Sequence, residues 1–305
     1  MVGRGPCVRL LQSTMVGVDV VVRGGDDLPV SGGTSPAPVD DHTDLLALPL
    51  HLGAVVVATA AFTVVVAAGA PWELALPAIL LECVLMALFW NRPAVRSVAL
   101  LGLLLSVLAL TPLMLLWPLP LLLALLIFVG LTRVSALSWD SGWLRPGRLS
   151  GSTWWLIAGV VPVSIVVLAL WYAVHGAELE GQAYYRQLLN THPWWILALM
   201  GAAFVVVNAA CEELLFCGVV QTAATRTSAI VGVGILVQCL FFGLIHYQGF
   251  PSGVLGIVLA ACYGVLLGVL RLRSGGLVAP WLAHMCADVT IVCLLLASET
   301  FSLIP

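Results

Sequence analysis

The sequence predicts an all-α protein whose helices form a bundle within a membrane. Of its 305 residues, 61% are hydrophobic and only 9% are charged, and apolar stretches recur from Leu45 to Ala297. Backbone inside a lipid bilayer must satisfy its own hydrogen bonds, so it is either helical or part of a closed barrel. The apolar runs are continuous and do not alternate with polar residues, which favours helices.

The chain divides into a polar tail and two groups of apolar segments. Residues 1–43, rich in Gly, Pro, Asp and Ser, predict a disordered cytoplasmic tail. A polar loop at 135–152 separates an N-terminal membrane region, 44–152, from a second membrane domain, 153–305. Several segments approach the roughly 20 residues that cross the hydrocarbon core, so we expect about nine spans. These are residues 45–69, 73–90, 96–114, 118–134, 153–175, 194–224, 228–247, 252–271 and 276–297.

The arginines predict how these spans are oriented. The chain has no lysine, and an N-terminus on the inner side puts eleven of its twelve arginines there, with only Arg186 outside. Arginine is enriched on the cytoplasmic side, so we expect a cytoplasmic N-terminus, an external C-terminus and a bacterial-style inner (plasma) membrane. Membrane lipid is the expected surrounding. Nucleic acid is excluded as a partner because the chain has no basic patch.

Two adjacent acids, Glu212 and Glu213, stand in the middle of the apolar segment 194–224. An ionised carboxylate in hydrocarbon costs at least ~2.5 to 3.5 kcal/mol, so such acids are retained where something pairs with them or uses them. Residues four apart share a face of a helix. This spacing joins three pairs in the trailing segments: Asn208 with Glu212, Phe242 with His246, and His284 with Asp288.

Polar faces inside lipid cost less when they meet, so we expect these three helices to converge around a wet cavity. A carboxylate and a histidine beside a water molecule form a plausible general base, and a second histidine with an aspartate could bind a developing oxyanion. The alternative is that these side chains are hydrogen-bonded packing residues, which are common between membrane helices.

In this order, the three motifs resemble those of the CPBP intramembrane proteases, which include the CAAX endopeptidases and bacteriocin-processing or immunity proteins. The family pattern is EExxxR, then FxxxH, then HxxxN or HxxxD, and the resemblance covers residues 194–297. It implies a catalytic core in the last four or five helices. It also implies that Glu212 with His246 activates water and that His284 with Asp288 stabilises the oxyanion. Glu213, Cys217, Asn208 and Phe242 are expected to support them.

One position departs from the pattern, because the family arginine is Cys217 here. Glu213 therefore loses its nearest cationic partner. Either Cys217 simply packs while Glu213 bonds elsewhere, or the thiol assists catalysis or contacts a cysteine-bearing substrate. Members of the family have been described both as metal-dependent and as glutamate-type proteases. A divalent metal such as zinc, or none, therefore remains open, with Glu212, His246 and His284 as candidate ligands.

We therefore predict an intramembrane endopeptidase that cuts a membrane-anchored protein or peptide near its anchor. C-terminal sorting tails of exported proteins are the favoured substrates, and prenylated CAAX proteins are the second choice. Two other classes remain open. A proton-coupled transporter would also bury Glu and His, and a non-catalytic membrane immunity or binding protein would keep the scaffold without needing the water-activating pair.

Overall fold

The computed structural model describes residues 41–67, 76–109, 111–134, 139–140, 142–175, 191–228 and 230–302. All regular secondary structure in these ranges is helical, which confirms the all-α prediction. The predicted tail lies almost entirely outside the described residues, since the first helix begins at Asp41.

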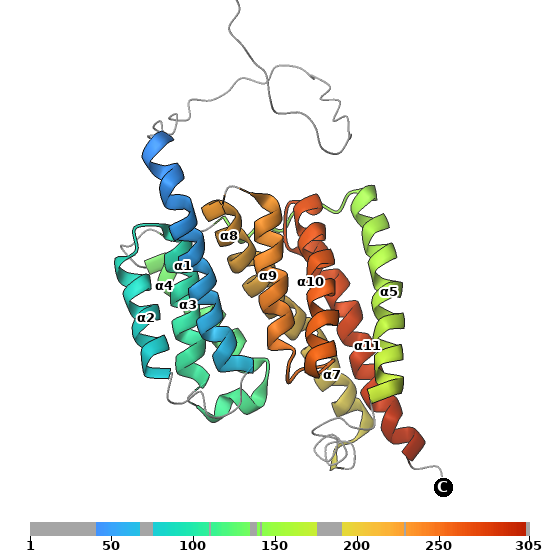
Figure 1. Cartoon of the computed structure of the whole chain (residues 1–305). Helices are drawn as coiled ribbons and strands as arrows, with labels where there is room; N and C mark the ends of the chain where they lie inside the picture. The colour runs from blue at the N-terminus through green and yellow to red at the C-terminus, as the bar shows by residue number, and fades with distance from the viewer. Residues whose placement is uncertain are drawn as a thin grey trace, which may run out of the picture. The chain divides into compact units, whose positions relative to one another are not determined.

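The leading half consists of α1 (Asp41–Ala67), α2 (Leu76–Phe89), α3 (Pro93–Ala109), the short 3-10 helix η2 (Pro112–Leu116) and α4 (Leu119–Val134) (Figure 1). Helix α3 packs against both α2 and α4. Apolar side chains fill the space between these helices, and the fully buried ones include Val55, Ala58, Phe62, Val95, Leu101 and Phe128. The predicted segment 96–114 is therefore two pieces, because α3 stops at Ala109 and η2 begins at Pro112.

The trailing half consists of α5 (Gly151–His175), α7 (Trp194–Glu213), the π-helical turn η4 (Leu214–Val220), α8 (Gln221–Ser228), α9 (Val231–Ile245), α10 (Gly253–Ser274) and α11 (Val278–Ser302). Helices α7, η4 and α8 follow one another without a break. Helix α11 contacts α5, α7 and α10, and α10 packs closely against α9 (Figure 1). Helix α11 is therefore central to this half.

Within the described residues, four helical stretches are long and apolar enough to cross a membrane: Gly151–His175, Trp194–Ser228, Gly253–Ser274 and Val278–Leu296. By length and composition they identify an integral membrane protein. The other predicted segments are also helical, and the apolar stretches found in them among the described side chains are 10–17 residues long. At 1.5 Å per residue, α9 with its 15 residues is about 22 Å long, short of the ~30 Å hydrocarbon core. The structure therefore does not confirm nine spans.

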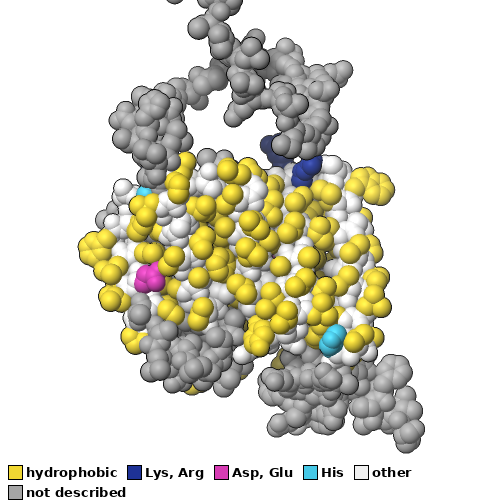
Figure 2. Space-filling view, in the orientation of Figure 1, with side chains coloured by type: hydrophobic (Ala, Val, Ile, Leu, Met, Phe, Trp, Pro, Cys, Tyr) yellow, Lys and Arg dark blue, Asp and Glu magenta, His cyan; other side chains and the backbone are white. Residues whose placement is uncertain are grey.

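The surface agrees with a lipid environment. Figure 2 shows one face covered mainly by hydrophobic side chains, with a small cationic group near one end. Large apolar side chains are exposed on separate helices, among them Trp155 of α5, Leu199 of α7 and Val254 of α10. In water an apolar surface of this extent would drive association, whereas hydrocarbon is a suitable solvent for it.

The arginines of the described residues gather at the helix ends that form one end of the bundle (Figure 1). Arg226, in the last turn of α8, pairs with Asp140, whose backbone N–H bonds Ser97 near the start of α3. The backbone N–H of Arg148, just before α5, donates to the carbonyl oxygen of Ser274 at the end of α10. The arginines of the described residues are therefore gathered at one end of the bundle, as the sequence predicts. That this end faces the cytoplasm remains a prediction.

A loop segment, Gly142–Ser150, fastens the turn between α10 and α11. The backbone N–H of Leu277 donates to Arg145 O at 2.8 Å, and that of Arg148 donates to Ser274 O at 2.8 Å. The backbones of the loop and of the turn touch at Gly147 and Gly276, where a Cβ added to Gly276 would lie 2.2 Å from Gly147 N. The loop therefore sets the position from which α11 starts.

Candidate functional site

The two acids of the first motif end α7 and are almost inaccessible: Glu212 is 4% exposed and Glu213 is 2% exposed. The next seven residues, Leu214–Val220, form the π-helical turn η4. A π-turn adds one residue to a helical turn and shifts the faces of the helix that follows, and such turns are frequent at functional sites. The acids therefore stand directly before a change of helical register.

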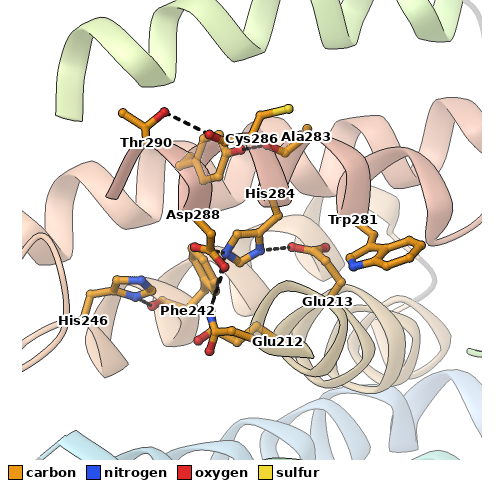
Figure 3. A network of polar contacts seen from close by, with 12 residues as sticks. Glu212, Glu213, Phe242, His246, Trp281, Ala283, His284, Cys286, Asp288 and Thr290 are labelled. Atoms are coloured by element: carbon orange, nitrogen blue, oxygen red, sulfur yellow. Dashed lines mark hydrogen bonds and ion pairs between the residues drawn. The ribbon is translucent and has the colours of Figure 1, made fainter. Parts of the chain in front are cut away.

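His284, on α11, lies among three carboxylates (Figure 3). Its Nδ1 is 2.8 Å from Glu213 Oε1, which is a hydrogen bond. Its Nε2 is 3.7 Å from Glu212 Oε2 and 3.7 Å from Asp288 Oδ1. Both of these distances are too long for a direct hydrogen bond, and both are within ion-pair range of a protonated imidazole. The predicted pairing of His284 with Asp288 across one helical turn is present.

Glu213 is more central than the sequence indicated. The missing motif arginine cast doubt on this residue, yet Glu213 makes the shortest polar contact to His284. Cys217, in the position of that arginine, is a free thiol that is 1% exposed. Glu213 bonds His284, and the Cys217 thiol also interacts with the Glu213 carboxyl group, so the structure leaves both interpretations of Cys217 open.

A chain of hydrogen bonds continues from the cluster. Asn208 Nδ2 donates to Asp288 Oδ2 at 3.1 Å, and Trp117 Nε1 donates to Asn208 Oδ1 at 2.8 Å. Asn208 and Asp288 are both buried. The leading half thus reaches the site through Trp117, which the sequence analysis did not select, because no motif or helical spacing connects it to Asn208.

His246 lies just past the end of α9, beside this cluster. Its Nδ1 is 2.8 Å from Phe242 O, and the Phe242 ring stands 4.7 Å from the His246 ring and 5.7 Å from the His284 ring between centroids. Within the described residues, no hydrogen bond or ion pair joins His246 to Glu212. The structure therefore brings Glu212, Glu213, His284, Asp288 and Asn208 together. It places the Phe242 ring in contact with both His246 and His284.

Helix α10 adds two residues that the motifs did not reveal. Tyr263 donates its hydroxyl hydrogen to Ala283 O at 2.8 Å, and its ring meets His284 edge-on at 6.1 Å. Arg271 Nη2 donates to Thr222 Oγ1 at 2.5 Å, and its charge acts on Glu213. Both are contacts between helices, so they depend on helix rotation and not on sequence spacing.

The candidate metal ligands, Glu212, His246 and His284, do not form a coordination cluster in this arrangement. Among the described residues, no group of three or more His, Cys, Asp or Glu side chains is placed to hold a metal ion. His284 Nδ1 already faces Glu213, and His246 Nδ1 faces Phe242 O. The donor atoms as they stand fit a hydrogen-bonded network better than the tetrahedral set that zinc prefers.

The fold and the site together define a class: helical membrane proteins with carboxylate and histidine side chains buried between their helices. Residues 193–290 match the family described as type II CAAX prenyl endopeptidase Rce1-like, so this region forms a domain of that family. The predicted resemblance to CAAX proteases is confirmed, over nearly the predicted range. The family is a protease family. Searches of curated proteins and of solved structures found no match to the chain.

Proposed function

We propose that the chain is an intramembrane endopeptidase that hydrolyses a peptide bond in a membrane-anchored protein or peptide. The observation that carries this proposal is the buried Glu212 Oε2, which makes no hydrogen bond within the described residues and lies 3.7 Å from His284 Nε2. A buried carboxylate oxygen without a partner is costly, and it is suited to accept a proton from water. The protease family of this domain supports the same reaction.

In the proposed mechanism, Glu212 removes a proton from a water molecule held beside His284. The hydroxide attacks the carbonyl carbon of the peptide bond, and the carbonyl electrons move to oxygen. Protonated His284 donates a hydrogen bond from Nε2–H to this oxyanion. Its Nδ1–H stays hydrogen-bonded to Glu213, and Asp288 lies beside the imidazole. When the tetrahedral intermediate collapses, the C–N bond breaks and Glu212 returns the proton to the leaving amine.

His246 is proposed to assist Glu212 in activating the water. This assignment rests on the FxxxH motif, since the hydrogen bond that the structure gives His246 is to Phe242 O. A His246→Ala variant separates this role from that of Glu212. If His246 shares in proton transfer, its loss reduces cleavage by about 100-fold. Unchanged cleavage would assign the whole step to Glu212.

The proposed substrates carry the scissile bond close to a membrane anchor, because the catalytic side chains are buried between apolar helices. C-terminal sorting tails of exported proteins remain the favoured class. Prenylated CAAX proteins, the class in the family description, are the alternative. The two differ in the fragment released, which is a membrane-spanning tail in the first case and a short peptide after a lipidated cysteine in the second.

The test compares cells that produce the wild-type chain with cells that produce Glu212→Gln, using mass spectrometry of membrane proteins and their C-terminal peptides. We expect at least one precursor to accumulate uncleaved in the Glu212→Gln cells. Glu82→Gln is the matched control, because it makes the same chemical change on α2, outside the protease domain. Identical precursor profiles for wild type and Glu212→Gln would contradict the proposed function.

A further inference from the structure

Trp117 connects the leading half of the chain to the candidate site. It follows η2, in the short connection before α4, and lies outside the protease domain at 193–290. Its indole N–H donates to Asn208 Oδ1 at 2.8 Å, and Asn208 Nδ2 donates in turn to Asp288 Oδ2 at 3.1 Å. Asp288 Oδ1 is 3.7 Å from His284 Nε2. Four side chains from three parts of the fold thus form one directed chain.

The direction of this chain follows from the chemistry of the indole group. An indole nitrogen can only donate a hydrogen bond, whereas an amide side chain has a donor end and an acceptor end. With its oxygen facing the Trp117 N–H, Asn208 must turn its NH₂ group toward Asp288. The flipped amide would face a donor with a donor and a carboxylate with a carbonyl oxygen. Trp117 therefore selects the orientation in which Asn208 holds Asp288.

We infer that Trp117 is a positioning residue of the site, acting on Asp288 and His284 through the amide of Asn208. The inference rests on the proposed function, since it gives the leading half a part in peptide hydrolysis. It goes beyond the motifs, all of which lie in the trailing half. It also predicts that the protease domain alone lacks the contact that orients the Asn208 amide.

The first test is Trp117→Phe, which keeps an aromatic ring and removes the N–H donor. Cleavage of the precursor that accumulates in Glu212→Gln cells should fall by about tenfold, because one hydrogen bond that orients the site is lost. Trp139→Phe is the matched control, since the buried Trp139 N–H makes no hydrogen bond within the described residues. The control should cleave like wild type. Full activity in Trp117→Phe would overturn the inference.

The second test asks whether Trp117 acts through Asn208. If it does, adding Trp117→Phe to Asn208→Ala causes no further loss of cleavage, because residues acting in one chain are not additive. A merely structural role for Trp117 would give losses that multiply in the double variant, and this result would contradict the inference.

The third test does not depend on cleavage. In purified full-length protein with labelled tryptophan indole nitrogens, Asn208→Ala should shift the N–H resonance of Trp117 and leave that of Trp139 in place. An unchanged Trp117 resonance would overturn the inference even if Trp117→Phe does not fold. If the resonance shifts but no precursor is ever cleaved, the hydrogen-bond chain stands and the proposed function fails.

Discussion

The leading and trailing halves are both built from apolar helices, but they bury their polar side chains differently. In α1, the hydroxyl groups of Thr59 and Thr63 donate to backbone carbonyls one turn earlier, at 2.7 and 2.8 Å. In the trailing half, His284 of α11 faces Glu213 and Glu212 of α7. Hydroxyl groups satisfied within their own helix add little cost in a membrane, whereas carboxylates gathered around a histidine between helices are expensive and mark functional sites.

The largest expected effect compares two buried histidines. His284→Ala removes the imidazole from among three carboxylates, so we expect cleavage to fall at least 100-fold and the free energy of unfolding to drop by about 3 kcal/mol. His51, in α1, has its Nδ1 3.1 Å from Trp90 Nε1 and its Nε2 3.2 Å from Arg92 Nε, and a neutral imidazole accepts a hydrogen bond from one of these donors. His51→Ala should cost only about 1 kcal/mol and leave cleavage unchanged. Thermal unfolding in detergent and cleavage of the precursor measure both.

If the two histidine variants lose stability and activity equally, the two halves do not differ in the way described. A loss of stability in His284→Ala without loss of cleavage would identify the cluster as packing residues, the alternative that the sequence left open.

The next effect concerns glycines. A Cβ at Gly276 would lie 2.2 Å from Gly147 N and 2.4 Å from Pro146 C, which are backbone atoms that cannot move aside cheaply. We expect Gly276→Ala to lower the unfolding free energy by about 2 kcal/mol and to displace the start of α11. Gly53, inside α1, has no such neighbour within 4 Å. Gly53→Ala should therefore be neutral or stabilising, by up to about 1 kcal/mol.

Limited proteolysis of the loop Gly142–Ser150 gives an independent measure of the Gly276→Ala effect, since a displaced turn exposes the loop. Equal melting temperatures for the two alanine variants would show that the loop does not fasten α11.

The smallest effect concerns the ion pair between Arg226 and Asp140, whose N–O distance is 2.6 Å. The Arg226 side chain is 49% exposed, so water and salt screen the attraction. Arg226→Gln should lower the unfolding free energy by less than about 1 kcal/mol, and the loss should shrink in high salt. Melting curves at two salt concentrations test this, and a large loss that is independent of salt would mean that the pair acts as a buried one.

The sequence was sufficient to predict that the chain is helical and which polar residues share one face of a helix, because hydrophobic runs and four-residue spacing are local properties. The pairing of His284 with Asp288 on one face of α11 is such a prediction. The bond from Glu213 to His284 and the chain from Trp117 through Asn208 could not be predicted, because they depend on the rotation and height of separate helices. The π-helical turn after Glu213 is a further reason, since it changes the face that each following residue presents.

Span lengths were predicted less well, for a related reason. The run of apolar residues from 228 to 247 predicted a helix long enough to cross hydrocarbon, but α9 covers only Val231–Ile245. His246 then lies in the turn that ends the helix. Apolar composition alone does not indicate where a helix stops. The sequence therefore predicted too long a helix and placed His246 inside it, whereas His246 follows the last helical residue.

The central claim is that Glu212 activates water to hydrolyse a peptide bond, and one measurement tests it most directly. Purified protein is incubated in isotopically labelled water with the precursor that accumulates in Glu212→Gln cells. Wild type should release a product whose new C-terminal carboxylate carries solvent oxygen, and Glu212→Gln should release none. Equal amounts of labelled product from both, or a wild-type product without the label, would contradict the account.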